Sequence, residues 1–173
     1  MTTFQMKHDI DCTPEKFWEL FFDNELQKKI FKDLEFPQWD VLEQKDTDKE
    51  IVRIVKAVPK LDAPGPVAKL LGPGFGYTEE GRFDKTSKVY KFVIKPTQLA
   101  DKLKNEGSVR LEPKGDDKCV RVVDIVAEAK VFGVGGMIEK MTEKSFRDGW
   151  AKSAEYFNRV VNAGAPPLHP ARS

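Results

Sequence analysis

Apolar residues recur with two different periods along the chain, and the change of period separates helical from extended segments. Near the start, Phe17, Leu20 and Phe21 follow helical spacing. They come directly after Thr13, which can cap a helix, and Pro14, which suits its first turn. We therefore predict a helix that begins here, and a second short helix, capped at Asp23 and Asn24, that follows it almost without a gap.

Between residues 36 and 132 apolar and polar positions alternate, which is typical of strands with one buried face. Segments rich in Gly, Pro and Asp interrupt the alternation and predict turns. Together with a first strand over residues 3–10, this pattern predicts an antiparallel sheet of about seven strands. The later strands are expected at residues 39–43 and 51–58, which form a hairpin, and at 74–84, 88–94, 107–112 and 119–132. Prolines in residues 59–73 predict a long loop with one helical turn.

The longest helical pattern runs from Met137 to about Asn162, and such a helix extends roughly 39 Å. A helix of this length can cover one face of the sheet. The predicted fold class is therefore α+β, with a curved antiparallel sheet, two short helices and a long C-terminal helix. We assign residues 1–162 to one domain. Residues 163–173 contain three prolines and no periodicity, so we expect a disordered tail.

The face of the long helix that would turn toward the sheet has small residues in its middle. Ser145, Gly149 and Ser153 stand where a solid core would use Leu or Phe. Either the sheet approaches the helix closely here, or a cavity separates the two. A glycine inside a helix costs about 1 kcal/mol relative to alanine, and both explanations would account for it.

Two short stretches, together with the order of elements, resemble a known superfamily. DCTPEKFW at residues 11–18 opens the paired short helices, and VFGVGGMIEK at residues 131–140 leads into the long one. Over about residues 3–161 the chain resembles the START and birch-pollen-allergen superfamily (SRPBCC) with its helix-grip fold, and within it a branch of unknown function. The resemblance implies a cavity between sheet and long helix that holds an apolar ligand such as a lipid, sterol or polyketide. It also implies that such a cavity can serve catalysis in some members.

Composition and charge exclude several other classes of function. The 173 residues include 29 Lys and Arg against 28 Asp and Glu, and the signs alternate locally, so we expect no binding to nucleic acid. Two histidines and the widely separated Cys12 and Cys119 form no ligand set or nucleophile motif, so we expect no metal, no cofactor and no catalytic residue. The chain has no long apolar run and no secretory signal, which predicts a cytoplasmic protein.

Side chains in phase on the strands and the long helix form a candidate binding wall. The alternation leaves open which way Arg53, Arg121 and Asp124 point, because each stands between apolar neighbours. If Arg53 and Asp124 point inward, they would hold the polar head of an apolar ligand; otherwise they pair across an exposed face. The candidate ligand-binding residues are Arg53, Phe75, Tyr77, Tyr90, Phe92, Asp124, Met141, Ser145, Gly149, Trp150 and Ser153.

The sequence favours a binding protein over an enzyme. We expect it to bind a hydrophobic small molecule and to transfer it within the cell. Two alternatives are an enzyme such as a cyclase or hydrolase, which needs buried polar groups with shifted pKa values, and an interaction scaffold with a filled core. The loop over residues 59–73 carries Lys60 and Lys69 beside the apolar Leu61 and Leu70. It either folds over the open end of the cavity or contacts a membrane surface transiently.

Overall fold

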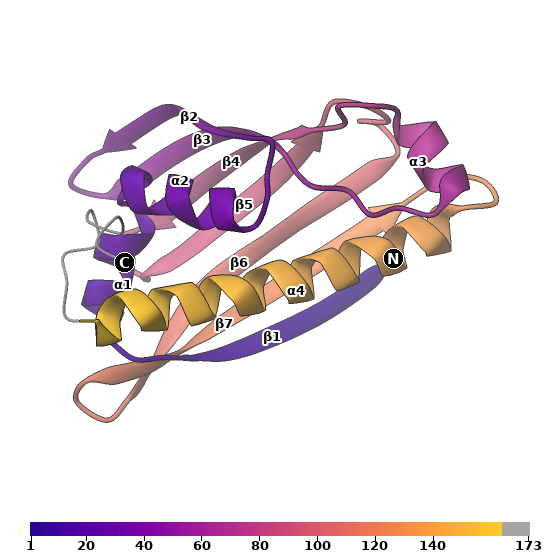
Figure 1. Cartoon of the computed structure of the whole chain (residues 1–173). Helices are drawn as coiled ribbons and strands as arrows, with labels where there is room; N and C mark the ends of the chain where they lie inside the picture. Colours follow the sequence, from indigo (N-terminus) through magenta and orange to yellow (C-terminus); the bar gives the residue numbers. More distant parts are fainter. Residues whose placement is uncertain (164–173) are drawn as a thin grey trace.

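A seven-stranded antiparallel sheet with a long helix across its inner face forms the body of the protein (Figure 1). The computed structural model describes residues 1–163. The strands are β1 (Thr2–Ile10), β2 (Gln38–Asp46), β3 (Glu50–Val58), β4 (Tyr77–Asp84), β5 (Val89–Pro96), β6 (Leu103–Lys114) and β7 (Lys118–Ala129). The helices are α1 (Pro14–Phe21), α2 (Asn24–Asp33), α3 (Gly65–Leu71) and α4 (Gly135–Asn162). This arrangement confirms the predicted α+β helix-grip fold.

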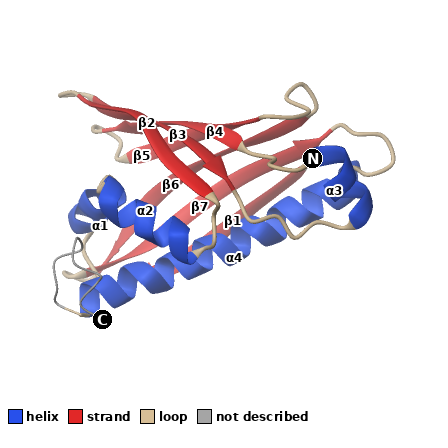
Figure 2. Cartoon of the chain, turned by 45° about the horizontal axis from the view of Figure 1, so that its top comes forward, coloured by secondary structure: helices blue, strands red, loops and turns tan. Residues whose placement is uncertain are grey.

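The sheet order is β1-β7-β6-β5-β4-β3-β2, so the strands from β2 to β7 pair in sequence order and β1 joins at the β7 edge. Figure 2 shows α1 and α2 at one end of the sheet and α3 at the other, with α4 running between them. Both short helices begin at the predicted caps. The side chain of Thr13 accepts a hydrogen bond from the backbone N of Lys16, and Asp23 accepts one from Leu26.

Several element bounds differ from the sequence prediction, each for a local reason. β6 begins at Leu103 rather than residue 107, because the polar Asn105 occupies an inward position and hides the alternation. β4 begins only at Tyr77, after two glycines with positive φ at Gly72 and Gly74. β7 ends at Ala129 instead of residue 132, since the chain turns there and enters α4.

The predicted tail begins at Ala163, and from residue 164 onward it lies outside the described residues. None of the helices within residues 1–163 is long and apolar enough to span a membrane.

The middle of α4 stands away from the sheet. In this helix, all of which is described, Ile138, Ala154 and Phe157 are the buried residues, so the central turns are at most partly buried. Apart from its own helical turn, a Cβ atom built on Gly149 would have no atom of the described residues within 4 Å. The first explanation for the small residues, close approach of the sheet, is therefore wrong at Gly149. The small side chains border open space.

Candidate ligand-binding cavity

A cavity of about 200 Å³ lies between the inner face of the sheet and α4. Strands β3 to β7 and the middle of α4 form its walls, α1 and α2 close one end, and residues 59–75 close the other. Ten of the eleven candidate residues line this cavity: Arg53, Phe75, Tyr77, Tyr90, Phe92, Met141, Ser145, Gly149, Trp150 and Ser153. They come from strands β3, β4 and β5, from the loop before β4 and from α4, and the curvature of the sheet brings these elements together.

Asp124 is the exception: of the two orientations that the alternation leaves open, it takes the outward one, so its place among the candidate ligand-binding residues is corrected. It pairs with Gln5 in the register of β1 and β7, and its Oδ1 accepts a hydrogen bond of 2.8 Å from the Gln5 side chain. Its neighbours Val123 and Ile125 are buried in the core instead. Asp124 thus borders a wide, open hollow of about 1900 Å³ on the opposite face of the sheet, whose lining includes charged side chains of both signs. It cannot contact a ligand in the internal cavity.

Arg53 points inward and joins the sheet to the two short helices. Its Nη1 donates to the carbonyl oxygen of Phe21 at 2.8 Å and to Oδ1 of Asn24 at 3.3 Å. The partial negative charge at the C-terminal end of α1 favours a cation there. The guanidinium carbon also lies 4.7 to 5.8 Å from the ring centres of Phe21, Phe22 and Trp39. Arg53 therefore has a structural role in addition to lining the cavity.

A carboxyl–phenol pair lies beside Arg53 on the inner face. The hydroxyl of Tyr90 donates to Oε2 of Glu79 at 2.9 Å. A Cβ atom on Gly81 would lie 1.8 Å from that hydroxyl oxygen, so glycine is needed there for the phenol to reach across β4. Burial raises the pKa of Glu79, and the nearby charge of Arg53 opposes this effect. Burial also raises the pKa of Tyr90 and of Tyr77.

Sequence reasoning missed Glu79 because it stands in a polar run between Thr78 and Glu80, which is typical of an exposed strand. The position of Glu79 in the alternation of β4 was the signal that could have revealed its inward orientation. Glu79 alternates with Tyr77 and Phe83, both of which face inward. The same argument applies to Asn105 on β6, which also lines the cavity.

Arg121 is fully buried, at 0% exposure, and lines the cavity from β7. Its Nη1 donates to Oγ of Ser153 at 3.1 Å, and its Nη2 donates to the carbonyl oxygen of Trp150 at 2.7 Å. A third contact of 3.2 Å joins Nη2 to Nδ1 of His8. The guanidinium carbon also lies 4.8 Å from the ring centre of Trp150. All of these partners are neutral groups or aromatic rings.

The protonation states of this cluster follow from burial. Desolvation lowers the pKa of Arg121 to about 9, so the side chain remains a cation at neutral pH. Desolvation, together with the Arg121 charge, lowers the pKa of His8 to about 4. His8 is therefore neutral at pH 7, and its Nδ1 accepts the hydrogen bond from Arg121.

The two cysteines do not form a reactive site. Cys12 and Cys119 are buried and free, and burial raises their pKa values to about 11 and about 12. Both are thiols at neutral pH, whereas nucleophilic cysteines need the thiolate. Within residues 1–163, no group of three or more His, Cys, Asp or Glu side chains is arranged to hold a metal ion.

Solved structures share this fold over nearly the whole chain, at low sequence identity. A START superfamily protein from Mycobacterium smegmatis is 14% identical with a TM-score of 0.58, covering 94% of this chain and 99% of its own. The ZhuI aromatase/cyclase from Streptomyces sp. R1128 is 14% identical with a TM-score of 0.63, covering 95% and 98%. Norcoclaurine synthase from Thalictrum flavum, in complex with dopamine and hydroxybenzaldehyde, is 15% identical with a TM-score of 0.65, covering 95% and 88%.

These likenesses establish the fold and leave the ligand open. A comparison with curated proteins found no match. The family model described as "Protein of unknown function (DUF2505)" matches residues 5–161, which is most of the chain. The protein has a START-like fold and belongs to the DUF2505 family.

Proposed function

We propose that this protein binds a small, largely apolar organic molecule in the cavity between the sheet and α4. The observation that carries the proposal is the open space at the centre of α4, where a Cβ atom on Gly149 would have no described atom within 4 Å beyond its own helical turn. Aromatic rings such as Phe92 and Trp150 line the same space. Burying apolar surface against them contributes about 25 cal/mol per Å².

The size and lining of the cavity narrow the kind of ligand. At about 200 Å³ it is smaller than the roughly 300–1,000 Å³ of sites for drug-sized molecules, which favours a compact ligand of one or two rings. The aromatase/cyclase and the synthase crystallised with dopamine and hydroxybenzaldehyde support an aromatic ligand for this chain as well. A few polar side chains among the rings would orient such a molecule.

Native mass spectrometry of freshly purified protein, followed by solvent extraction, tests the proposal. A stoichiometric small molecule supports it. Gly149→Leu, which fills the cavity, should then reduce the bound fraction at least about tenfold. Gly136→Leu is the matched control, because Gly136 lies in the same helix, is exposed and does not line the cavity. Protein that carries no ligand and fails to bind a panel of aromatic and aliphatic compounds would overturn the proposal.

Catalysis in the same cavity is the second candidate, and the Glu79–Tyr90 pair favours it. A carboxyl group whose pKa is raised by burial keeps its proton to a higher pH than an ordinary carboxyl group, which is the direction that general acid–base chemistry requires. A cyclase acting on the bound molecule would use these groups. Glu79→Gln should then leave ligand binding within about twofold while abolishing turnover. Equal conversion of the extracted ligand by the wild type and the variant would exclude this role.

Transfer of the ligand requires a way into the cavity, and we place it at residues 59–75. Val67 and Leu71 of α3 pack on Ile138, and Leu71 lines the cavity, so this segment covers one end. Leu61 and Leu70 remain exposed and could contact a membrane surface during uptake. Sedimentation with anionic vesicles tests this step. Loss of binding in a Leu61→Ser, Leu70→Ser double variant would support it, and wild-type protein that stays in solution would overturn it.

A further inference from the structure

The two buried arginines of the inner face differ in their electrostatic surroundings. Arg53 has Glu79 near enough to influence the carboxyl pKa, and it donates to the carbonyl end of a helix. Arg121 has no such neighbour: among residues 1–163, its polar contacts are a serine hydroxyl, a main-chain carbonyl and a neutral histidine. Neither arginine forms an ion pair with a described carboxylate, but only Arg53 has one close by.

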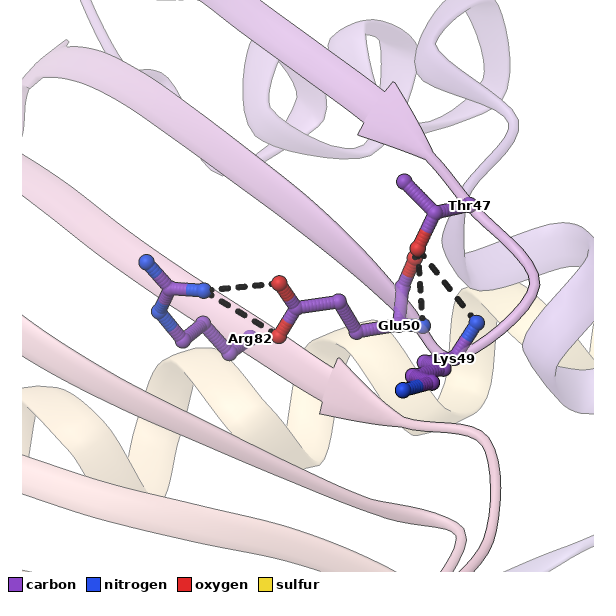
Figure 3. Close-up of polar contacts among 4 residues, drawn as sticks. All are labelled: Thr47, Lys49, Glu50 and Arg82. Atoms are coloured by element: carbon purple, nitrogen blue, oxygen red, sulfur yellow. Dashed lines mark hydrogen bonds and ion pairs between the residues drawn. The ribbon is translucent and has the colours of Figure 1, made fainter.

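Cations on the outer face of the sheet are paired in the usual way. Nη1 of Arg82 lies 2.9 and 3.1 Å from the two carboxylate oxygens of Glu50, in contact with solvent (Figure 3). Each charge in an exposed ion pair of this kind gains little stability from the other, because water already solvates both charges. A cation withdrawn from water has no such compensation and is strongly destabilised unless an anion accompanies it.

Arg121 also retains unused hydrogen-bonding capacity. Its Nε is buried and has no partner among the described residues, although a guanidinium offers five N–H donors. Nε of Arg53 is unpartnered as well, so the difference between the two side chains lies in charge rather than in donor count. Arg121 is therefore a fully buried cation on the cavity wall that lacks an anion and has a free donor.

We infer that the ligand is an organic anion, and that its carboxylate or an equivalent group binds Arg121 while its apolar body lies against Trp150 and Phe92. The inference rests on the proposed function and names the class of ligand. An anion would provide the missing counter-charge and an acceptor for Nε, in hydrogen bonds stronger than those between neutral groups. Trp150, stacked near Phe92 with ring centres 6.4 Å apart, offers an aromatic surface directly beside the guanidinium.

Isothermal titration calorimetry with two compounds of equal shape tests the inference. The probes are β-naphthoate, an anion at pH 7, and β-naphthamide, its neutral counterpart. The wild type should bind the naphthoate at least about tenfold more tightly, the ratio that one charge-assisted hydrogen bond supplies. Arg121→Met should abolish this preference while still binding the amide, which shows that the cavity is intact. Arg82→Met, which removes an exposed cation of the outer face, should keep the full preference.

A second measurement on the wild type does not depend on any variant folding. Titrations of β-naphthoate in two buffers of different ionisation enthalpy give the number of protons taken up on binding. Binding of the anion by Arg121 predicts no uptake at pH 7, whereas uptake of about one proton per ligand would show that the cavity takes the neutral acid and would overturn the inference.

The remaining outcomes separate the inference from the proposed function. Equal affinity for the two probes would overturn the anionic ligand and leave a binding cavity. A preference that disappears in Arg53→Met but persists in Arg121→Met would also overturn it, because the anion would then lie at the other arginine. Failure of both probes, together with protein that carries no extractable ligand, would overturn both proposals.

Discussion

The two faces of the sheet use charge in opposite ways. On the outer face cations stand beside carboxylates in water, as Arg82 does with Glu50 and Lys95 with Glu80. On the inner face Arg53 and Arg121 are buried at 3% and 0% exposure, and neither forms an ion pair within residues 1–163. Water screens the charges of the outer face but not those of the inner face. The same type of charged side chain therefore affects stability and binding far more on the inner face than on the outer face. Function should therefore depend on the inner face, and substitutions there should have the larger effects.

The largest effect is expected at Gly81, where the inner face has no room for a side chain. Gly81→Ala would bring a Cβ atom against the Tyr90 hydroxyl and ring, so we expect a loss of about 2–3 kcal/mol in the free energy of unfolding. Urea denaturation followed by circular dichroism measures this change. Tyr90→Phe in the same background should restore part of the stability, because the hydroxyl oxygen makes the shortest contact. An unchanged denaturation midpoint for Gly81→Ala would show that the phenol is free to move away.

The next effect contrasts the two inner arginines directly. Arg53→Met should lower the free energy of unfolding by about 2 kcal/mol, since it removes the hydrogen bonds to Phe21 and Asn24 and the packing against aromatic rings. Arg121→Met should change the stability of the ligand-free protein by less than about 1 kcal/mol, because the loss of hydrogen bonds is offset by removal of an uncompensated cation.

Thermal unfolding of both variants, after removal of any ligand by solvent extraction and refolding, measures this difference. A large destabilisation by Arg121→Met, equal to that of Arg53→Met, would mean that the neutral partners already satisfy Arg121. The inference that Arg121 lacks a counter-ion would then have no energetic support.

A smaller effect, dependent on pH, is expected at His8 beside Arg121. The pKa of His8 is about 4 in the folded protein against an ordinary value of 6.5, so the unfolded state takes up the proton first as the pH falls. Stability should therefore be highest above pH 6.5 and decrease between pH 6.5 and about 4. The part due to His8 is about 1–2 kcal/mol, allowing for its partial exposure.

Urea denaturation of the wild type and of His8→Gln at several pH values isolates this contribution. The difference in unfolding free energy between the two proteins should change across the interval from pH 6.5 to 4 and stay constant above it. Parallel curves throughout would show that burial and the Arg121 charge do not lower the pKa of His8 in the folded protein.

The contrast between the faces also explains what could be predicted from the sequence. The helices α1 and α2 followed from local signals at Thr13 and Asp23, and the alternation in the strands separated two sets of side chains correctly. Alternation alone does not indicate which set faces the helix, so the orientation of Arg53, Arg121 and Asp124 needed the pairing of whole strands.

Other features of the cavity depend on how neighbouring elements pack against one another. The hydrogen bond between Tyr90 and Glu79 becomes evident only when Gly81 on β4 lies opposite Phe92, so that the Tyr90 phenol can reach across the strand. The open space at Gly149 depends on how far α4 stands from the sheet, a distance set by Ile138 at one end and Phe157 at the other. Neither relation leaves a periodic signal in the chain.

The smallest effect is expected on the outer face, and it completes the comparison. Glu50→Gln removes the carboxylate that contacts Arg82 in two places, yet both side chains are well exposed. The loss of stability should be about 0.5 kcal/mol or less, and it should vanish at high salt, because water and ions already screen the pair. Ligand affinity should not change. If Glu50→Gln instead weakened binding of β-naphthoate as much as Arg121→Met, charge on the outer face would influence the cavity through the sheet, and the functional separation of the two faces would be wrong.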